Sequence, residues 1–442
     1  MTIAGLVRRL RRSAAASVRP AAHAVLRVPL ARRALLAALG VPFDPFAPAF
    51  RDDPYPIYHG LRRRDSVHFA RCGYWFVTGY AEAAAMLRDP RIGHPDHRTA
   101  LADDPRVTPL DCLRNHLFLT MNPPDHTRIR RAVTEHFTPA AAEQLRPRVQ
   151  ALADRLLDRV APAGCLDVVG DLAYPLALGT IAGALGVPSE DFDRLRPPVW
   201  TVVAIAFDPM PSPSQLGRGS VAAEWLRDYF GGLLAERRHS PLPDLLTALV
   251  EAERLGQLDG EETLATGILL LMAGYETTVD VIGNGLFALL RHPAELQRLR
   301  DDQDLIRSAV EELVRYDSPV QWVSRVAVED VVVGNRLIRR GQQIYVFTGA
   351  ANRDPARFPD PDRLDITRQD RAHLGFGAGL HACPGQHLAR VEAQVAIATL
   401  VRRFSRMQLL AERPVRHDSL QRRGLQALPI AVGLDNDAPL PR

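Results

Sequence analysis

The spacing of apolar and polar residues predicts a chain that is mostly helical, with a few short strands. Apolar residues recur at helical spacing in several long segments, which predict helices over 80–88, 125–137, 139–160, 185–238 (broken near 208–214) and 259–290. Short segments rich in β-branched and aromatic residues predict a hairpin over 67–69 and 74–77 and strands over 326–333 and 343–347. No repeat is found, and no linker follows residue 45. The predicted fold class is therefore mainly α with small β-sheets, in a single large domain.

The first 42 residues differ in charge from the rest of the chain. Residues 1–43 contain eight arginines and no acidic residue, whereas the remaining residues carry 47 basic and 51 acidic side chains. Leucines fall at roughly helical spacing among these arginines, so the segment is either a solvated, partly disordered leader or a basic helix on an anionic membrane surface. Arginines also interrupt any apolar core that a signal peptide would need. We therefore divide the chain into an Arg-rich N-terminal leader, 1–42, and one domain, 43–442.

Composition narrows the class of protein further. The cysteines are irregularly spaced, which fits neither a disulfide framework nor a zinc site and predicts a cytoplasmic location; they are Cys72, Cys112, Cys165 and Cys383. No apolar run approaches ~20 residues, so no transmembrane segment is predicted. The body is net acidic and lacks a basic stripe with interleaved aromatic residues, so nucleic acid is not an expected partner.

One cysteine stands in a segment whose composition indicates a metal ligand. Residues 376–385 read Phe-Gly-Ala-Gly-Leu-His-Ala-Cys-Pro-Gly, and an apolar, helix-like run follows. A Cys383 thiolate would then lie at a helix N-terminus, where N–H groups and the helix dipole stabilise negative charge. Such a sulfur can ligate haem iron, and the glycines would let the backbone pass close under a flat macrocycle. The alternative is a buried, inert cysteine after a tight turn.

The longest predicted helix contains the sequence Ala-Gly-Tyr-Glu-Thr-Thr at residues 273–278. Small side chains at Ala273 and Gly274 would open space beside a flat cofactor. The hydroxyl of Thr277 can bond back to the carbonyl of residue 273, and the Glu276 carboxylate beside it supplies a means to relay protons into a buried groove. The alternative is an ordinary helix whose Glu-Thr-Thr faces solvent.

Both segments resemble the cytochrome P450 family, whose haem-binding signature is matched here by Phe376, Gly377, His381, Cys383 and Gly385. The resemblance implies the cytochrome P450 fold and a haem b cofactor whose iron is axially ligated by Cys383. It also implies that Glu276 and Thr277 are the acid–alcohol pair that delivers protons to dioxygen, in a helix where Ala273 and Gly274 line the cofactor.

Two places are suited to the haem propionates. His126 and Arg130 lie four residues apart on one predicted helix face, and Arg325 follows a separate apolar run. Arginine forks match carboxylates well, and His381 would add a third donor from the cysteine loop. One departure from the family is Asn122, where bacterial members usually have aspartate.

Glu312 and Arg315 stand three apart on a predicted helix and can form an ion pair. By itself such a pair indicates only a solvated helix face. The resemblance implies instead a buried Glu-x-x-Arg pair joined by an arginine from a later loop, which makes Arg363 the expected third member. This triad would be a structural element that retains haem.

The resemblance implies a bacterial, soluble haem-thiolate monooxygenase that uses O2 and two electrons to hydroxylate or epoxidise a small molecule. The chain has no room for a reductase, so ferredoxin and ferredoxin reductase are the expected partners, with Arg128 and Arg131 as docking residues. The segments expected to line the substrate pocket are mostly apolar, which favours a medium-to-large hydrophobic substrate; they are 91–113, 199–205, 270–274, 320–323 and 424–426. A GC-rich bacterial composition favours tailoring of a secondary metabolite such as a polyketide, macrolide or peptide.

Two other functions remain open from the sequence. One is a same-fold enzyme that catalyses oxidative cyclisation or coupling. The other is a non-catalytic relative that activates a partner protein. The intact Cys383, Glu276 and Thr277 count against the non-catalytic relative.

Overall fold

The computed structural model describes residues 29–95, 108–206 and 211–433. Most of these residues are helical, as predicted. The helices are α3 (Pro29–Leu39), α4 (Pro48–Asp52), α5 (Tyr55–Arg64), α6 (Tyr80–Met86), α8 (Pro109–His116), α9 (Asp125–Thr134), α10 (Pro139–Val160), α11 (Tyr174–Leu185), α12 (Phe192–Ala206), α13 (Pro213–His239), α14 (Leu245–Arg254), α15 (Gly260–Arg291), α16 (Pro293–Asp301), α17 (Ile306–Tyr316), α18 (Thr348–Ala351) and α19 (Gln386–Arg403).

The described strands form three small sheets. They are β1 (Val67–Phe69), β2 (Tyr74–Val77), β3 (Ile92–Gly93), β4 (Cys165–Asp167), β5 (Val323–Ala327), β6 (Val331–Val333), β7 (Arg336–Ile338), β8 (Gln343–Val346), β9 (Arg406–Leu409) and β10 (Pro429–Gly433). One sheet has the order β1-β2-β8-β5-β3, with β2 and β8 parallel; β4-β10-β9 form a second and β6-β7 a third. The predicted β1–β2 hairpin is confirmed, with Val67 opposite Val77.

The strand predicted over 326–333 is two strands in different sheets. Residues 328–330 bend between β5 and β6, and the Asp330 carboxylate there accepts a hydrogen bond from the backbone N–H of Arg340 (2.8 Å). A polar Glu-Asp pair at the bend favours a turn over a continuous strand.

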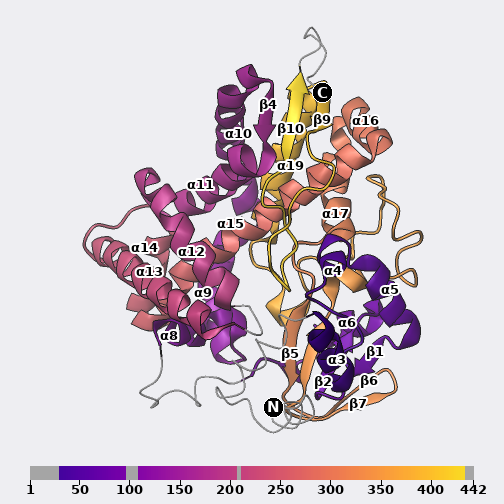
Figure 1. Cartoon of the computed structure of the whole chain (residues 1–442). Helices are drawn as coiled ribbons and strands as arrows, with labels where there is room; N and C mark the ends of the chain where they lie inside the picture. The colour runs from indigo at the N-terminus through magenta and orange to yellow at the C-terminus, as the bar shows by residue number, and fades with distance from the viewer. Residues whose placement is uncertain (1–28, 96–107, 207–210, 434–442) are drawn as a thin grey trace.

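The elements separate into a helix-rich part and a strand-rich part (Figure 1). Helices α10–α14 gather on the left of the view, whereas α3–α6 pack with β1, β2 and the β6–β7 hairpin on the lower right. Helix α15 runs between the two parts and packs closely against α11, α19 and α17. The segments that carry chemistry therefore meet where α15 and α19 lie together.

Helix α15 is the central core helix, and its sequence explains both ends. It begins with a capping box in which the Asp259 carboxylate accepts from the Glu262 N–H (2.8 Å) and the Glu262 carboxylate accepts from the Asp259 N–H (3.1 Å). It ends at Arg291, just before a His-Pro step. Helix α15 and residues 168–185 are long and apolar enough to span a membrane, but 83% and 61% of their apolar windows are buried inside the protein, as in core helices.

Part of the predicted leader is structured against the body. Residues 1–28 lie outside the described residues, but α3 buries Leu35 and Leu36 against its neighbours. The carbonyl of Leu39 accepts a hydrogen bond from the Cys72 N–H (2.8 Å), and Arg32 pairs with Asp44 (2.8 Å). Residues 29–39 are therefore held on the β1–β2 hairpin.

Candidate active site

The loop before α19 presents the Cys383 sulfur at the start of a helix. The loop is closed by a hydrogen bond from the Cys383 N–H to the Phe376 carbonyl (2.8 Å). It requires glycine at Gly379, where φ is +69° and a Cβ would lie 2.2 Å from a backbone carbonyl oxygen at the end of α6. Helix α19 then begins at Gln386, three residues after the cysteine.

The environment of the Cys383 thiol combines burial with groups that favour the thiolate. Burial is the largest influence and raises the pKa of the thiol above its ordinary value, and backbone N–H bonds from Gly385 and Gln386 and the charges of Arg130 and Arg390 offset part of this rise. A buried sulfur with helix N–H groups directed at it is the arrangement expected of an anionic metal ligand. The sequence prediction of a cysteine at a helix N-terminus matches this geometry.

Phe376, the first residue of the motif, is positioned by a cation above its ring. The Arg390 guanidinium lies 4.3 Å from the ring centroid and pairs with Glu311 (2.5 Å). His373 also contacts this carboxylate (3.0 Å). Burial raises the pKa of Glu311, but these two partners outweigh burial and lower it to about 2, so the carboxylate is ionised at neutral pH.

Three histidines and two arginines gather beside the cysteine loop. The His381 ring lies 4.1 Å from that of His126 and 4.7 Å from that of His94, between ring centroids. Arg130 donates to the Ala382 carbonyl (2.6 Å). Burial lowers the pKa values of both His126 and His381, and the charge of Arg130 adds to this effect. Arg325 also lowers both pKa values, so the four predicted propionate residues share one electrostatic environment.

This cationic cluster is short of anions. No carboxylate among the described residues forms an ion pair with Arg130 or Arg325, and within that part of the chain the buried ring nitrogens of His126 find no hydrogen-bond partner. Burial lowers the pKa of Arg325 to about 10; burial and the nearby arginines lower that of His126 to about 4. Donors of this kind fit a bound group that brings its own carboxylates, as haem does.

The sequence analysis missed His94. It follows β3 and has no motif around it, but both of its backbone groups are tied to Asn122. The Asn122 side chain accepts from the His94 N–H (2.8 Å) and donates to the His94 carbonyl (2.7 Å). An ionised aspartate could accept but not donate, so the departure from the family at Asn122 has a role here.

On α15, the residues of the 273–278 motif differ in how far they are exposed. Ala273 is exposed and Gly274 and Thr277 are half-buried in a helix whose other residues are mostly buried, so these residues face the same open side. The Thr277 hydroxyl donates to the Ala273 carbonyl (3.4 Å), as predicted. Gly274 also admits close packing of α11, because a Cβ there would lie 2.5 Å from a side-chain carbon of Ile181.

Glu276 points to the C-terminal loop. Its Oε1 accepts from the Tyr275 hydroxyl (3.3 Å), and its Oε2 is paired with Arg422. The Arg422 Nε also lies 3.0 Å from Asp280, and its guanidinium lies 4.6 Å from the ring centroid of Trp200 on α12. The sequence did not predict Arg422 as the partner of this acid.

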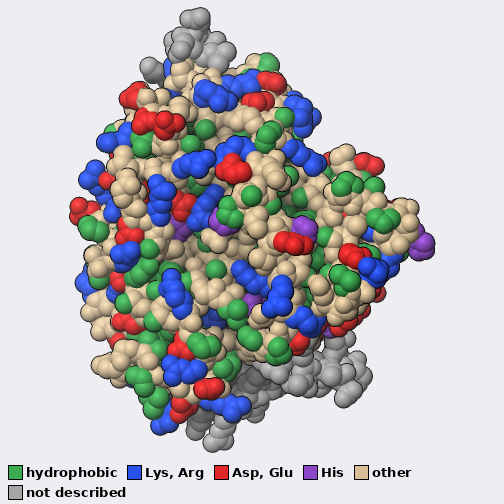
Figure 2. Space-filling model, turned by 180° about the vertical axis from the view of Figure 1, so that it is seen from behind, with side chains coloured by type: hydrophobic (Ala, Val, Ile, Leu, Met, Phe, Trp, Pro, Cys, Tyr) green, Lys and Arg blue, Asp and Glu red, His purple; other side chains and the backbone are tan. Residues whose placement is uncertain are grey.

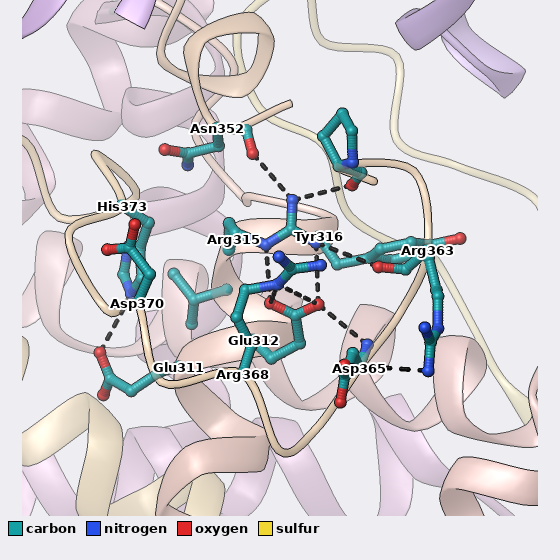
Figure 3. A network of polar contacts seen from close by, with 12 residues as sticks. Glu311, Glu312, Arg315, Tyr316, Asn352, Arg363, Asp365, Arg368, Asp370 and His373 are labelled. Atoms are coloured by element: carbon teal, nitrogen blue, oxygen red, sulfur yellow. Dashed lines mark hydrogen bonds and ion pairs between the residues drawn. The ribbon is translucent and has the colours of Figure 1, made fainter. Parts of the chain in front are cut away.

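The Glu-x-x-Arg pair is buried, but its expected third member is wrong (Figure 3). Glu312 accepts two bonds from Arg315 (2.6 and 2.8 Å), and both side chains are 1% exposed. Arg368 supplies the second cation, 3.2 Å from Glu312. Arg363 contributes only its carbonyl, which accepts from Arg315 (3.3 Å), while its side chain is 63% exposed and lies 3.9 Å from Asp365.

The two arginines expected at a partner-docking surface, Arg128 and Arg131, differ in whether their charge is available to a partner. Arg128 donates two bonds to Glu262 (2.7 and 2.8 Å) at the start of α15, so its charge is neutralised within the protein. Arg131 is exposed on the same helix. Figure 2 shows arginine and acidic side chains interspersed over one face of the molecule, without a basic stripe that would follow a nucleic acid.

Comparisons with known proteins agree with this geometry. The family model described as Cytochrome P450 matches residues 199–421. The biotin biosynthesis cytochrome P450 of Bacillus subtilis (strain 168) is 40% identical, covering 81% of this chain and 91% of the relative. The cytochrome P450 monooxygenase PikC of Streptomyces venezuelae is 39% identical, covering 86% and 91%. A solved structure of P450BioI with hexadec-9Z-enoic acid ligated acyl carrier protein has a TM-score of 0.82 at 37% identity, covering 87% and 99%.

The chain therefore belongs to the cytochrome P450 family. It has the cytochrome P450 fold, and its relatives are monooxygenases, which are oxidoreductases. Members of the family bind haem through a cysteine thiolate, and the donor set beside Cys383 fits that cofactor.

Proposed function

We propose that this cytochrome P450 hydroxylates or epoxidises a medium-to-large hydrophobic molecule in the biosynthesis of a bacterial secondary metabolite. Cys383 is the residue proposed to ligate the haem iron. The observation that carries this assignment is the half-buried Cys383, whose sulfur is bonded by the N–H groups of Gly385 and Gln386 at the start of α19. Electrons would come from a ferredoxin and its reductase, docking near the cysteine loop where Arg131 is exposed.

The chain's own residues have three tasks around the cofactor. Bound haem supplies the activation of O2 and the transfer of one oxygen atom. Arg130, Arg325, His126 and His381 hold its propionates, since these donors have no carboxylate partner among the described residues. Phe376, Gly377 and Gly385 shape the loop around the sulfur, and Ala273 with Gly274 forms the facing stretch of α15.

Thr277 and Glu276 are proposed to move protons into the site. Thr277 Oγ1 holds a proton on the open side of α15, where it can pass to water. Glu276 is tied to Arg422 and Tyr275, so it reaches Thr277 only through water or after its ion pair opens. In the proposed relay, the Thr277 hydroxyl lies on the open side of α15, and the Glu276 carboxylate is held next to it in the sequence by Arg422 and Tyr275.

The segments expected to line the substrate site include two that lie side by side. Gln321 donates its backbone N–H to the Gln421 carbonyl (2.9 Å), and Arg423 donates to the Pro319 carbonyl (2.7 Å). The 320–323 segment and the C-terminal loop thus form one wall. The PikC relative carries the name of a monooxygenase, which supports oxygen insertion, whereas a structural neighbour named as the cytochrome P450 enzyme CxnD for C–S bond formation supports the alternative of oxidative coupling.

The relay is tested by Thr277→Ala with Thr278→Ala as the matched control. Each hydroxyl bonds to the carbonyl four residues earlier at 3.4 Å, but Thr277 is half-buried on the open side and Thr278 is buried. Losing a positioned proton-transfer group costs ~10²–10⁴-fold in the assisted step, and water recovers part of this loss. With a surrogate ferredoxin and reductase, Thr277→Ala should divert most of the NAD(P)H consumed into peroxide, whereas Thr278→Ala should not.

The same series tests the cysteine. Cys383→Ala should lose the thiolate-type spectrum of the reduced, CO-bound protein, while Thr277→Ala keeps it. Equal peroxide yields in Thr277→Ala and wild type would remove Thr277 from the relay. A thiolate-type spectrum in Cys383→Ala would remove Cys383 as the ligand and with it the proposed function.

A further inference from the structure

A group of metal-binding side chains lies where α8 meets the start of α15. Cys112 and His116 stand four residues apart on α8, so their side chains share one face of that helix. Glu261 reaches them from the first turn of α15, and one ligand atom from each of the three lies within 4.8 Å of the others. The spacing of the cysteines alone predicts no zinc site, because Glu261 lies 149 residues after Cys112.

This cluster is remote from the proposed active site. Thr277 follows Glu261 sixteen residues later on α15, which is ~24 Å along the helix axis at ~1.5 Å per residue. The capping box that starts α15 uses Asp259 and Glu262, so the Glu261 side chain has no part in that cap. Neither the haem site nor the helix cap therefore explains why the three side chains meet.

The sulfur and the carboxylate are already close to the separation that a shared metal ion requires. Cys112 Sγ lies 3.9 Å from Oε2 of Glu261. Zinc binds sulfur at ~2.3 Å and carboxylate oxygen at ~2.0 Å, so the two atoms would stand ~3.5 Å apart around a tetrahedral ion. Arg227 on α13 holds the carboxylate by one hydrogen bond to each oxygen (2.7 and 2.8 Å). Each carboxylate oxygen has a second lone pair, so these bonds orient Glu261 and still leave Oε2 an electron pair for a metal.

The imidazole of His116 is oriented as metal-binding histidines usually are. Its Nδ1 lies 2.8 Å from the Cys112 carbonyl, and because a carbonyl only accepts hydrogen bonds, Nδ1 carries the proton of the neutral ring. Nε2 therefore keeps the lone pair that binds a metal, and the backbone carbonyl fixes this tautomer. Cys112 and His116 are half-buried and the Glu261 side chain is 45% exposed, so an ion and a water molecule can reach them from solvent.

We propose that Cys112, His116 and Glu261 bind one Zn²⁺ ion, with water in the fourth position. Zinc accepts thiolate sulfur, imidazole nitrogen and carboxylate oxygen together, whereas Mg²⁺ and Ca²⁺ require oxygen ligands. Binding displaces the thiol proton of Cys112 to solvent, and the resulting thiolate and the carboxylate together outweigh the charge of Arg227. The ion joins α8 to α15 and so fastens two helices that are distant in sequence. This site goes beyond the proposed oxygenase function and does not depend on it.

Calorimetric titration of zinc chloride into the full-length, haem-loaded protein tests the site. The wild type should bind one ion tightly per chain. Cys112→Ser and His116→Gln each remove a ligand and should weaken binding about 100-fold or more, because losing even an outer partner of a ligand costs ~10–100-fold. Zinc at 100-fold above the dissociation constant should raise the melting temperature of the wild type by about 3 °C. At the same zinc concentration the two variants should show almost none of this rise.

The matched controls remove the same residue types outside the cluster. His292→Gln removes a half-buried histidine whose Nδ1 also lies 2.8 Å from the carbonyl four residues earlier. Cys72→Ser removes another half-buried cysteine. Both should bind zinc as the wild type does. All four variants should keep the thiolate-type spectrum of the reduced, CO-bound protein, which shows that each is folded and haem-loaded.

X-ray absorption at the zinc edge of the loaded wild type identifies the ligands directly. It should show one sulfur at ~2.3 Å and nitrogen or oxygen neighbours at ~2.0 Å. A shell of nitrogen and oxygen alone, or equal zinc affinity of the wild type and Cys112→Ser, would show an adventitious ion only and overturn the proposal. Failure of the wild type to bind zinc would overturn it as well.

Discussion

Two groups of buried and half-buried arginines in this protein differ in what neutralises their charge. Around Glu312, the guanidinium groups of Arg315 and Arg368 meet a carboxylate, and Arg315 also donates to the Asn352 and Pro361 carbonyls (2.9 and 2.8 Å). Beside the cysteine loop, Arg130 and Arg325 have backbone carbonyls as their partners and no carboxylate among the described residues. The first group is a closed group, meaning that a carboxylate of the chain itself pairs with its charges. The second group has no such carboxylate among the described residues.

The difference separates structure from binding. A buried charge costs several kcal/mol unless it is paired and hydrogen-bonded. The Glu312 group satisfies that requirement with residues of this chain, so it stabilises the fold whether or not a cofactor is present. The charges of the Arg325 group are paired only when a ligand brings an anion, so this group stabilises the protein only after the ligand has bound. Substitutions in the two groups should therefore have opposite effects on the protein without haem.

The largest expected effect is that of Glu312→Gln. It leaves Arg315 buried without its carboxylate, and breaking a buried pair by removing one partner costs about 3–5 kcal/mol. The free energy of unfolding, measured in urea on haem-free protein, should fall by that amount. Glu251→Gln, which breaks an exposed pair with Arg254 (2.6 Å), is the control and should leave the free energy of unfolding nearly unchanged, because solvent screens this pair. Equal small losses in both variants would show that the closed group is not a stabilising one.

A smaller effect distinguishes Arg368 from Arg363. Arg368 is 12% exposed and contacts both Glu312 and the Pro359 carbonyl (2.9 Å), so Arg368→Gln should cost about 1–3 kcal/mol of unfolding free energy. Arg363 contributes only backbone to the group, so Arg363→Gln should stay within about 0.5 kcal/mol of wild type. The reverse order of the two variants in urea unfolding would restore the sequence prediction.

That error shows where reading the sequence reaches its limit. The cysteine motif and the α15 motif are each a continuous stretch of sequence, so the spacing within each stretch was enough to identify its residues. The second cation of the Glu312 group comes from a loop with several arginines, and the conformation of that loop decides which of them turns inward. Here Arg315 binds the carbonyl at position 363, which directs that side chain outward and leaves the carboxylate to Arg368.

Long-range pairs were missed for the same reason. Glu276 and Arg422 are separated by 146 residues, and His94 is linked to His381 only through the folded chain. Helices with strong apolar spacing, such as α10 and α15, were predicted almost to the residue. Strands of two or three residues, such as β3 and β4, carry too little pattern to be found before their partners are known.

The smallest effect on the haem-free protein, and the one of opposite sign, is expected from Arg325→Gln. Arg325 is 8% exposed on β5 and lacks a carboxylate partner within the described chain, so removing its charge relieves a desolvation cost that the hydrogen bond to the Ser324 carbonyl offsets only in part. The free energy of unfolding of that form should be unchanged or slightly higher. The haem-loaded form should behave differently, because the same substitution removes a charge-assisted bond to a propionate.

Haem transfer to apomyoglobin measures that second effect. Arg325→Gln should release haem about tenfold faster than wild type, corresponding to the loss of one charged hydrogen bond. Arg300→Gln, on α16, is the matched control: the Arg300 guanidinium donates to the Phe404 carbonyl (3.4 Å) at the end of α19, burial also lowers its pKa, and it lies outside the histidine cluster. It should leave haem transfer unchanged. If Arg325→Gln instead destabilises the haem-free protein as Glu312→Gln does, both arginine groups are structural, and the distinction between a closed group and a ligand-binding one fails.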